Sequence, residues 1–461
     1  MAKLGVVITD GVGFRNFILT DFIKEANKNF NQVVIYSFLP AEAYNDYKPD
    51  CKIVEMDVYS ESFITWFFRK SKEVAHLRLH KNDNFGILDS YNINRSKSWN
   101  TRGLATRFIF AFTAVFHSER WILRFNRLQQ LSLSKSELSR SFDEKIDEDN
   151  IDLLFFTHQR PPFIAPLIYQ AERRKIKTAS FIFSWDNLAS KGRMAGNFDF
   201  YLVWSDLMKS ELLQFYKSVN AKQIAVVGTP QFEPYVMDNF NMEKEAFFKL
   251  FGFDATLPVI CFTCNDSSSK NDPLYIEDIA DAIKAGQIKA NLMVRTSPAD
   301  VPRRFLYLKE RYPFIYWNFP DWVLTRDKHA ELWSQRVPSF HDIVLLKALL
   351  KYSDVSVNIL STIILDAFLF DTPAICPVYG DAEKGYGTID KFLDYGHLRN
   401  VVKSKAVAIP ATRQAFLNDI ENALQNPESR LKEQQDFVAF EIGKPIHQTS
   451  ARIAEVLSGL V

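Results

Sequence analysis

The sequence has little cysteine for its length and no long apolar run. Its 461 residues include only four cysteines, Cys51, Cys261, Cys264 and Cys376. That is too few for a disulfide framework and favours a reducing compartment. No run of 18 or more apolar residues occurs, so we expect no transmembrane helix. Met1-Ala2-Lys3 leads directly into an expected strand, so we expect no signal peptide and a cytoplasmic location.

A strong net charge is also absent. The formal net charge is +1, whereas general nucleic-acid-binding proteins are strongly basic, so we expect no nucleic-acid partner. Hydrophobic residues make up 47% and charged residues 24%, as in ordinary globular proteins. The chain is too long for one ordinary core, which predicts two domains.

Residues 352–378 predict a strand, a turn, a helix over 363–370 and a second strand. Ser361 and Thr362 stand where this helix begins. Two hydroxyls, backbone N–H groups and a helix dipole would meet there, which suits a phosphate. Asp366 lies one turn further on the same face and could accept hydrogen bonds from a ribose. The alternative is that Ser361 and Thr362 only cap the helix.

The first residues predict the opening of a doubly wound α/β sheet. Strands at 4–8 and 32–38 flank a glycine-containing loop at 9–16 and a helix at 17–29, which is a βαβ unit. The loop lacks the third glycine of the dinucleotide fingerprint, so NAD or FAD is not expected.

Two later strands end in polar residues, where α/β sheets place their ligands. The strand at 152–156 leads to His158, and the strand at 178–183 leads to Trp185-Asp186 and then Lys191. The structural alternative for Asp186 is an Asx turn that closes a loop.

Residues 60–140 are basic and aromatic. This segment holds 14 Lys or Arg against six acidic residues, among many Phe and Trp. One interpretation is a set of helices with a solvated basic face. The other is a surface for an anionic partner, either a lipid-linked acceptor at the membrane or an acidic glycan.

Several of these stretches resemble motifs of GT-B glycosyltransferases and of the related CDP-glycerol glycerophosphotransferases. The matching residues are Ser353-Asp354, Ser361-Thr362, Asp366, Pro373-Ala374-Ile375, Trp185 to Gly192, Arg295-Thr296 and the strand and linker at 224–235. The order of elements matches over most of the chain, although each motif is short.

This resemblance implies an α/β protein of GT-B type, with two doubly wound Rossmann-like domains facing a cleft. Residues 1–235 would form an acceptor-side domain with a helical basic-aromatic insert at about 60–140. Residues 236–435 would bind a nucleotide-sugar, and a C-terminal helix within 436–461 would cross back to the first domain.

The implied activity is sugar transfer from a nucleotide-sugar to a hydroxyl of a glycan or lipid-linked acceptor, in surface polysaccharide or glycolipid assembly. The nucleotide-sugar is a substrate, and neither a cofactor nor a metal ion is expected. Donor contacts are expected from Arg295, Ser361, Thr362, Asp366, Lys191 and Ser267, the last from a polar loop after a strand. Contact with an anionic membrane would place the chain at its inner face.

Asp186 is the first candidate for the catalytic base, because it stands where the glycerophosphotransferases have a histidine. Asp10 and His158 are the next candidates. Retaining enzymes commonly have two glutamates eight positions apart, but Asn358 precedes Asp366 by eight, so an inverting course is expected. The alternatives are CDP-linked glycerophosphate or polyol-phosphate transfer, sugar 2-epimerisation, and a non-catalytic sugar-nucleotide-binding subunit.

Overall fold

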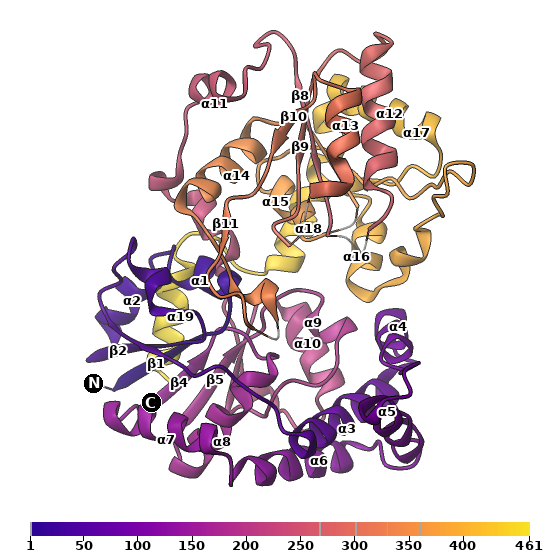
Figure 1. Cartoon of the computed structure of the whole chain (residues 1–461). Coiled ribbons are helices and arrows are strands. Elements are labelled where there is room, and N and C mark those ends of the chain that lie inside the picture. Colours follow the sequence, from indigo (N-terminus) through magenta and orange to yellow (C-terminus); the bar gives the residue numbers. More distant parts are fainter. Residues whose placement is uncertain (1, 267–268, 300–301, 330, 360) are drawn as a thin grey trace. The chain divides into compact units, whose positions relative to one another are not determined.

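A computed structural model describes residues 2–266, 269–299, 302–329, 331–359 and 361–461, and they form two compact units (Figure 1). Unit 1 contains Met1–Glu233, Leu324–Val337 and Glu441–Val461, and unit 2 contains Pro234–Val323 and Pro338–Phe440. The sequence-based division placed all of 236–435 in the second domain. The structure instead assigns residues 324–337, here called the return segment, to unit 1.

Unit 1 contains a parallel sheet of seven strands in the order β3-β2-β1-β4-β5-β6-β7. The strands are β1 (Lys3–Ile8), β2 (Gln32–Ser37), β3 (Lys52–Glu55), β4 (Leu153–Phe156), β5 (Lys177–Phe181), β6 (Phe200–Val203) and β7 (Ile224–Val226). The central strands β1 and β4 are almost continuously apolar and buried, as expected for parallel strands covered on both faces.

The expected loop at 9–16 is wrong, because most of it is helix α1 (Gly11–Phe17). The expected helix at 17–29 shortens to α2 (Phe22–Asn29). The physical reason is a cap: the Asp10 side chain accepts hydrogen bonds from the backbone N–H groups of Val12 and Gly13. That cap begins a helix which the two glycines do not suggest.

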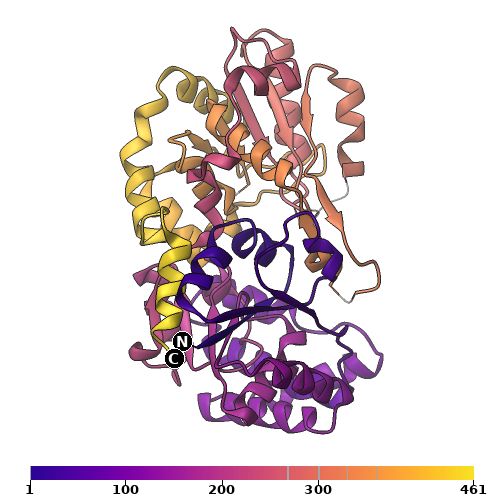
Figure 2. The same ribbon diagram turned by 90° about the vertical axis from the view of Figure 1, so that its left-hand side faces the viewer.

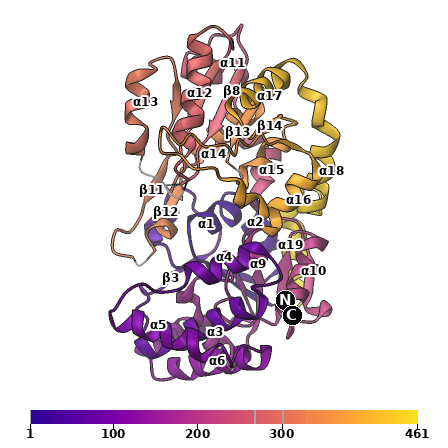
Figure 3. The same ribbon diagram turned by 90° about the vertical axis from the view of Figure 1, so that its right-hand side faces the viewer.

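Helices follow β3 and precede β4 through the basic-aromatic stretch. They are α3 (Phe63–His80), α4 (Phe85–Ile93), α5 (Thr101–Phe112), α6 (Glu119–Leu133) and α7 (Glu137–Asp149). Helix α3 packs against α4, α5 and α6 (Figure 3). Lys72 on α3 is buried, and its Nζ donates to Asn126 Oδ1 on α6 at 2.9 Å and to the Ala195 carbonyl at 2.7 Å.

The other helices of unit 1 are α8 (Ala165–Arg174), α9 (Asn187–Ser190), α10 (Asp206–Phe215) and α19 (Thr449–Ser458). The C-terminal helix α19 packs against α2 and is the yellow helix beside the indigo elements in Figure 2.

Unit 2 contains a parallel sheet of six strands in the order β10-β9-β8-β13-β14-β15. They are β8 (Val259–Thr263), β9 (Asn291–Arg295), β10 (Tyr316–Asn318), β13 (Val355–Asn358), β14 (Ala374–Ile375) and β15 (Val407–Ala408). Two short strands, β11 (Trp322–Leu324) and β12 (Arg336–Pro338), stand at the two ends of the return segment, across the unit boundary, and form a separate sheet. The α-helices are α11 (Lys244–Phe251), α12 (Asp272–Lys284), α13 (Leu306–Arg311), α14 (Phe340–Tyr352), α15 (Ile363–Phe368), α16 (Gly396–Ser404), α17 (Arg413–Gln425) and α18 (Leu431–Ile442), which ends past the boundary.

The return segment packs on the N-terminal part of unit 1. Arg326 Nη2 lies 2.5 Å from Glu55 Oε1, and Gln335 Nε2 donates to the Phe38 carbonyl at 3.4 Å. The Arg336 carbonyl oxygen passes so close to Gly11 that a Cβ there would lie 1.6 Å from it. Only glycine fits where the return segment crosses the start of α1.

We therefore expect Gly11→Ala to reduce the free energy of unfolding by about 1–3 kcal/mol, since overpacking against backbone forces a shift. Urea unfolding measures the change. Gly387→Ala is the matched control, because a Cβ there meets no atom within 4 Å. A Gly11→Ala protein as stable as the control would contradict the seating of the return segment on α1.

Candidate functional site

Each large sheet has a topological switch point, where successive connections run in opposite directions from neighbouring strands. In unit 1 this point lies between β1 and β4, and in unit 2 between β8 and β13. Open α/β sheets bind ligands beyond the carboxyl ends of the strands at such points. Two candidate regions follow, one in each unit.

Asp10 lies at the switch point of unit 1, directly after β1, and is fully buried. Its Oδ1 accepts the backbone N–H groups of Val12 at 3.0 Å and Gly13 at 2.9 Å. Its Oδ2 accepts the Thr9 hydroxyl at 2.7 Å and lies 2.9 Å from His158 Nδ1. One carboxylate therefore joins the end of β1, the start of α1 and the residues after β4.

Burial alone would raise the pKa of Asp10, but the interaction with His158 and the hydrogen bonds from Thr9 and Gly13 outweigh it and lower that pKa. Asp10 is therefore ionised at neutral pH and can only accept hydrogen bonds. His158 must then carry its proton on Nδ1, which leaves the Nε2 lone pair available to accept another proton.

His158 is held on a second side by an aromatic ring. The Phe183 ring stacks on the imidazole with centroids 3.9 Å apart and planes 12° from parallel. Burial lowers the pKa of His158, against the opposing effect of its hydrogen bond to Asp10. The imidazole is therefore neutral at pH 7 and fixed in orientation, as a general base requires.

Asp186 and Lys191 flank helix α9 after β5, the strand beside β4. Lys191 Nζ lies 3.4 Å from Asp186 Oδ2, and Asn187 Nδ2 donates to Asp186 Oδ1 at 3.1 Å. Gln159 Nε2 donates to Asn187 Oδ1 at 2.9 Å and so joins the segments after β4 and β5. The three predicted catalytic residues thus follow three adjacent strands of one sheet.

Three further residues near His158 were missed. Trp333 of the return segment has its ring centroid 6.4 Å from that of His158. Glu331 of the same segment interacts electrostatically with Asp10. Arg160 follows His158 by two residues, and its place just after a strand was a usable signal. No sequence signal indicated that residues 324–337 belong to unit 1.

The second region lies at the switch point of unit 2. Asn265, after β8, donates its Nδ2 to the carbonyl of Ile359, after β13, at 2.7 Å. Thr362 is the N-cap residue of α15, but its side chain makes no capping hydrogen bond. The hydroxyl that was expected either to cap the helix or to meet a phosphate therefore does not serve as a cap.

Asp366 and Arg295 are both buried and engaged. The Tyr235 hydroxyl donates to Asp366 Oδ1. Arg295 Nη2 lies 2.8 Å from Asp342 Oδ2, and Arg295 Nη1 donates to Asn318. A diphosphate would have to compete with Asp342 for this guanidinium, so the role given to Arg295 stays a prediction that this geometry does not favour. Ser267 lies outside the described residues.

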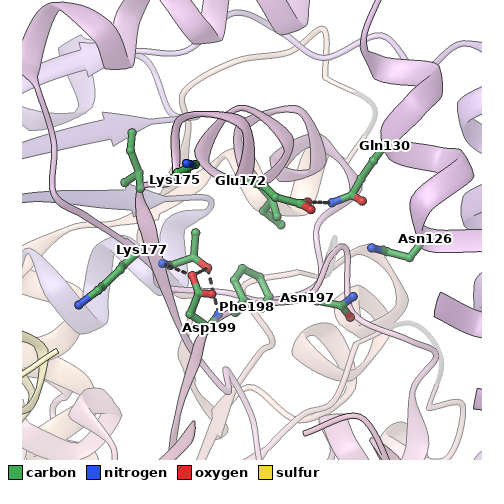
Figure 4. A pocket seen from close by; sticks show the side chains of 11 residues that line it. Asn126, Gln130, Glu172, Lys175, Lys177, Asn197, Phe198 and Asp199 are labelled. Carbon is green, nitrogen blue, oxygen red and sulfur yellow. Dashed lines mark hydrogen bonds between the residues drawn. The ribbon is translucent and has the colours of Figure 1, made fainter. Parts of the chain in front are cut away.

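A pocket of about 410 Å³ opens at the amino ends of β5 and β6 (Figure 4). Lys177 and Thr178 begin β5, and Thr178 donates to the Asp199 carboxylate just before β6 through its backbone N–H and its hydroxyl, both at 2.8 Å. This pocket lies at the sheet edge opposite Asp10 and His158, so it does not belong to the candidate site.

In the described part of the chain, no group of three or more His, Cys, Asp or Glu side chains could hold a metal ion. No described helix combines the length and the apolar character needed to cross a membrane.

The structure of this chain is similar to several solved structures of other proteins. A glycosyltransferase from Rickettsia africae aligns with a TM-score of 0.53 and 12% identity over 100% of this chain and 98% of its own. A putative UDP-N-acetylglucosamine 2-epimerase from Listeria monocytogenes aligns with a TM-score of 0.57 and 9% identity over 100% and 96%. An Anabaena protein solved in complex with UDP gives 0.51 and 10% identity over the whole of both chains.

No family model matches the chain, and no curated protein matches it either. The structural likeness shows the fold: the chain has the GT-B fold, which these glycosyltransferases and 2-epimerases share. The predicted GT-B class with two Rossmann-like domains is thereby confirmed, whereas the basic-aromatic insert and the cleft stay predictions. None of the three structures is a CDP-glycerol glycerophosphotransferase, so that part of the resemblance stays a prediction.

Proposed function

We propose that the chain is a glycosyltransferase that moves a sugar from a nucleotide-sugar to a hydroxyl acceptor with inversion and without a metal ion. The observation that carries this proposal is the Asp10–His158 pair at the switch point of unit 1. A buried carboxylate that orients a neutral imidazole is an arrangement suited to general base catalysis. Nucleotide-sugar binding is supported by similar structures solved with UDP or UDP-GlcNAc.

In the proposed reaction, His158 Nε2 removes the proton from the acceptor hydroxyl as its oxygen bonds to the anomeric carbon. The bond between that carbon and the donor diphosphate breaks, and the nucleoside diphosphate leaves with the electron pair. Asp10 acts through His158: it fixes the tautomer and stabilises the imidazolium that forms. Asp186 is the alternative base.

In unit 2, Ser361 and Thr362 would bind the donor diphosphate at the start of α15. Their hydroxyls and the backbone N–H groups there are the donors that an anion needs. Asp366 would accept hydrogen bonds from the ribose, in exchange for or beside the Tyr235 hydroxyl.

The proposed acceptor is a glycan or lipid-linked glycan of surface polysaccharide or glycolipid assembly, met at an anionic membrane. Helix α5 supports this with the exposed side chains of Leu104, Phe108 and Ala111, which share one helix face. The Arg107 guanidinium lies 3.9 Å from the ring centroid of Trp99, which is 78% exposed. Between residues 84 and 136, eight Lys or Arg stand against two acids. Such a face fits an anionic lipid surface.

We expect the double variant Ser361→Ala, Thr362→Val to bind nucleotide more weakly, because each lost charge-assisted hydrogen bond costs about 1.5–3 kcal/mol. Thermal shift against a panel of nucleotides and nucleotide-sugars, uridine compounds first, measures the change. If the folded double variant binds nucleotide as tightly as the wild type, the diphosphate does not bind at Ser361 and Thr362.

We expect His158→Gln to lower kcat about 10²–10⁴-fold, since the variant lacks the basic nitrogen. Asp186→Asn should lower it much less. Because the pKa of His158 is lowered, the wild-type kcat/KM should fall on acidification only below about 6.5, the ordinary histidine value. Transfer assays across pH, with separation of transfer, hydrolysis and 2-epimerisation products, measure these effects.

Donor binding by both variants is the control in that experiment, because it should equal that of the wild type. A large loss of kcat in Asp186→Asn, with near-normal turnover in His158→Gln, would identify Asp186 as the catalytic base. A dominant 2-epimerised product would favour the epimerase alternative. Nucleotide binding without any turnover would favour the non-catalytic subunit.

We expect Phe108→Asp to weaken binding to anionic vesicles at least about tenfold, because it places a negative charge on the apolar face of α5. Flotation with phosphatidylglycerol or phosphatidylcholine vesicles at low and high salt measures binding, which should need the anionic lipid and fall with salt. Leu250→Asp, which changes an exposed leucine of α11 in unit 2, is the matched control. Salt-insensitive binding, or equal effects of both variants, would indicate that the basic face is only solvated and does not bind an anionic membrane.

A further inference from the structure

Arg160 is a half-buried arginine beside His158 that has no side-chain partner in the described structure. Its Nε is buried and lacks a hydrogen-bond partner. No ion pair of its guanidinium occurs among the described residues either. A guanidinium with a buried, unsatisfied Nε donor is costly unless an acceptor such as an anion completes it.

The neighbouring cations differ from Arg160 because their charges are already paired. Arg69 bonds Glu61 through Nε at 2.7 Å and Glu73 through Nη1 at 2.8 Å. Arg193 bonds Glu119 at 2.7 Å, and Lys191 lies 3.4 Å from Asp186. Unlike these cations, Arg160 makes no hydrogen bond or ion pair among the described residues, although its charge helps to lower the pKa of Glu73.

Glu331 of the return segment is an acidic residue in a similar situation to Arg160. Its carboxylate is half-buried and makes no hydrogen bond or ion pair within the described part of the chain. Burial raises the pKa of Glu331 and the negative charge of Asp10 adds to the rise, while Arg69 and Arg160 oppose it. Arg160 and Glu331 therefore lie in one electrostatic environment with Asp10 but do not pair directly.

We infer that Arg160 and Glu331 form an acceptor subsite for an anionic glycan: Arg160 binds a phosphate or carboxylate of the acceptor, and Glu331 accepts a hydrogen bond from one of its hydroxyls. The planar guanidinium fork matches both anions bidentately. Arg160 follows His158 by two residues, and Glu331 precedes by two residues Trp333, whose ring centroid is 6.4 Å from that of His158, so the subsite would hold the reacting hydroxyl near His158 Nε2. That the bound glycan is the acceptor rests on the proposed function, whereas the anion site itself does not.

The test measures binding of two probes, inorganic phosphate and glucuronate, by titration calorimetry on the full chain. We expect Arg160→Met to weaken binding of one probe about 10–100-fold, as loss of a charge-assisted contact implies. The probe that responds identifies phosphate or carboxylate as the anion. Arg140→Met, which removes an exposed arginine of α7, should bind like the wild type. The Ser361→Ala, Thr362→Val double variant should retain this site, which separates it from a donor phosphate site in unit 2.

Arg160→Lys keeps the charge without the fork and should lose less affinity than Arg160→Met, which keeps the test decisive if Arg160→Met does not fold. Glu331→Gln should leave phosphate binding intact and raise the KM for a glycan acceptor. Unchanged binding in Arg160→Met and Arg160→Lys, or no binding of either probe by the wild type at about 10 mM, would overturn the inference. Anion binding at Arg160 without any nucleotide binding would contradict the proposed function and leave the anion site standing.

Discussion

The buried Asp10 carboxylate is the contact on which unit 1 most depends. It begins helix α1 through Val12 and Gly13, and it positions His158 after β4. A buried carboxylate is costly unless its oxygens are satisfied, and here four donors satisfy them. One of these four contacts, the one with His158 Nδ1, also sets the histidine tautomer. Structural and chemical roles of this residue therefore cannot be separated by removing its charge.

The two sheets place different chemistry at equivalent positions. Unit 1 places an acid, an imidazole and an arginine beyond its central strands, which suits proton transfer and anion binding. Unit 2 places hydroxyls and a short helix there, with its acids and Arg295 held in internal contacts such as the Arg295–Asp342 pair. Under the proposed function, the base would belong to the sheet of unit 1 and the hydroxyls for the donor to the sheet of unit 2, because each switch point forms within its own sheet.

The sequence predicted most of the parallel strands, because they are short apolar runs followed by polar residues, but it did not predict β3, β10 or β15. It placed Asp10, His158 and Asp186 at strand ends, but it could not show that Asp10 and His158 touch, since 148 residues separate them. It misjudged the start of α1, where a cap outweighed two glycines. The sequence also could not predict the side-chain contacts of Arg295, because no local pattern indicates that Asp342 pairs with a residue 47 positions earlier.

The return segment explains why the site in unit 1 exceeds what its first 233 residues supply. Residues 324–337 follow β10 of unit 2 in the chain, yet they bring Glu331 and Trp333 to the side of His158. Gly11 accommodates their backbone where any side chain would collide. Gly11, in a stretch that lacks the dinucleotide fingerprint, thus has another physical reason: it permits a segment from elsewhere in the chain to pass the start of α1 and reach the side of His158. Under the proposed function, this segment would supply contacts to the acceptor, while the sheet of unit 1 holds Asp10 and His158.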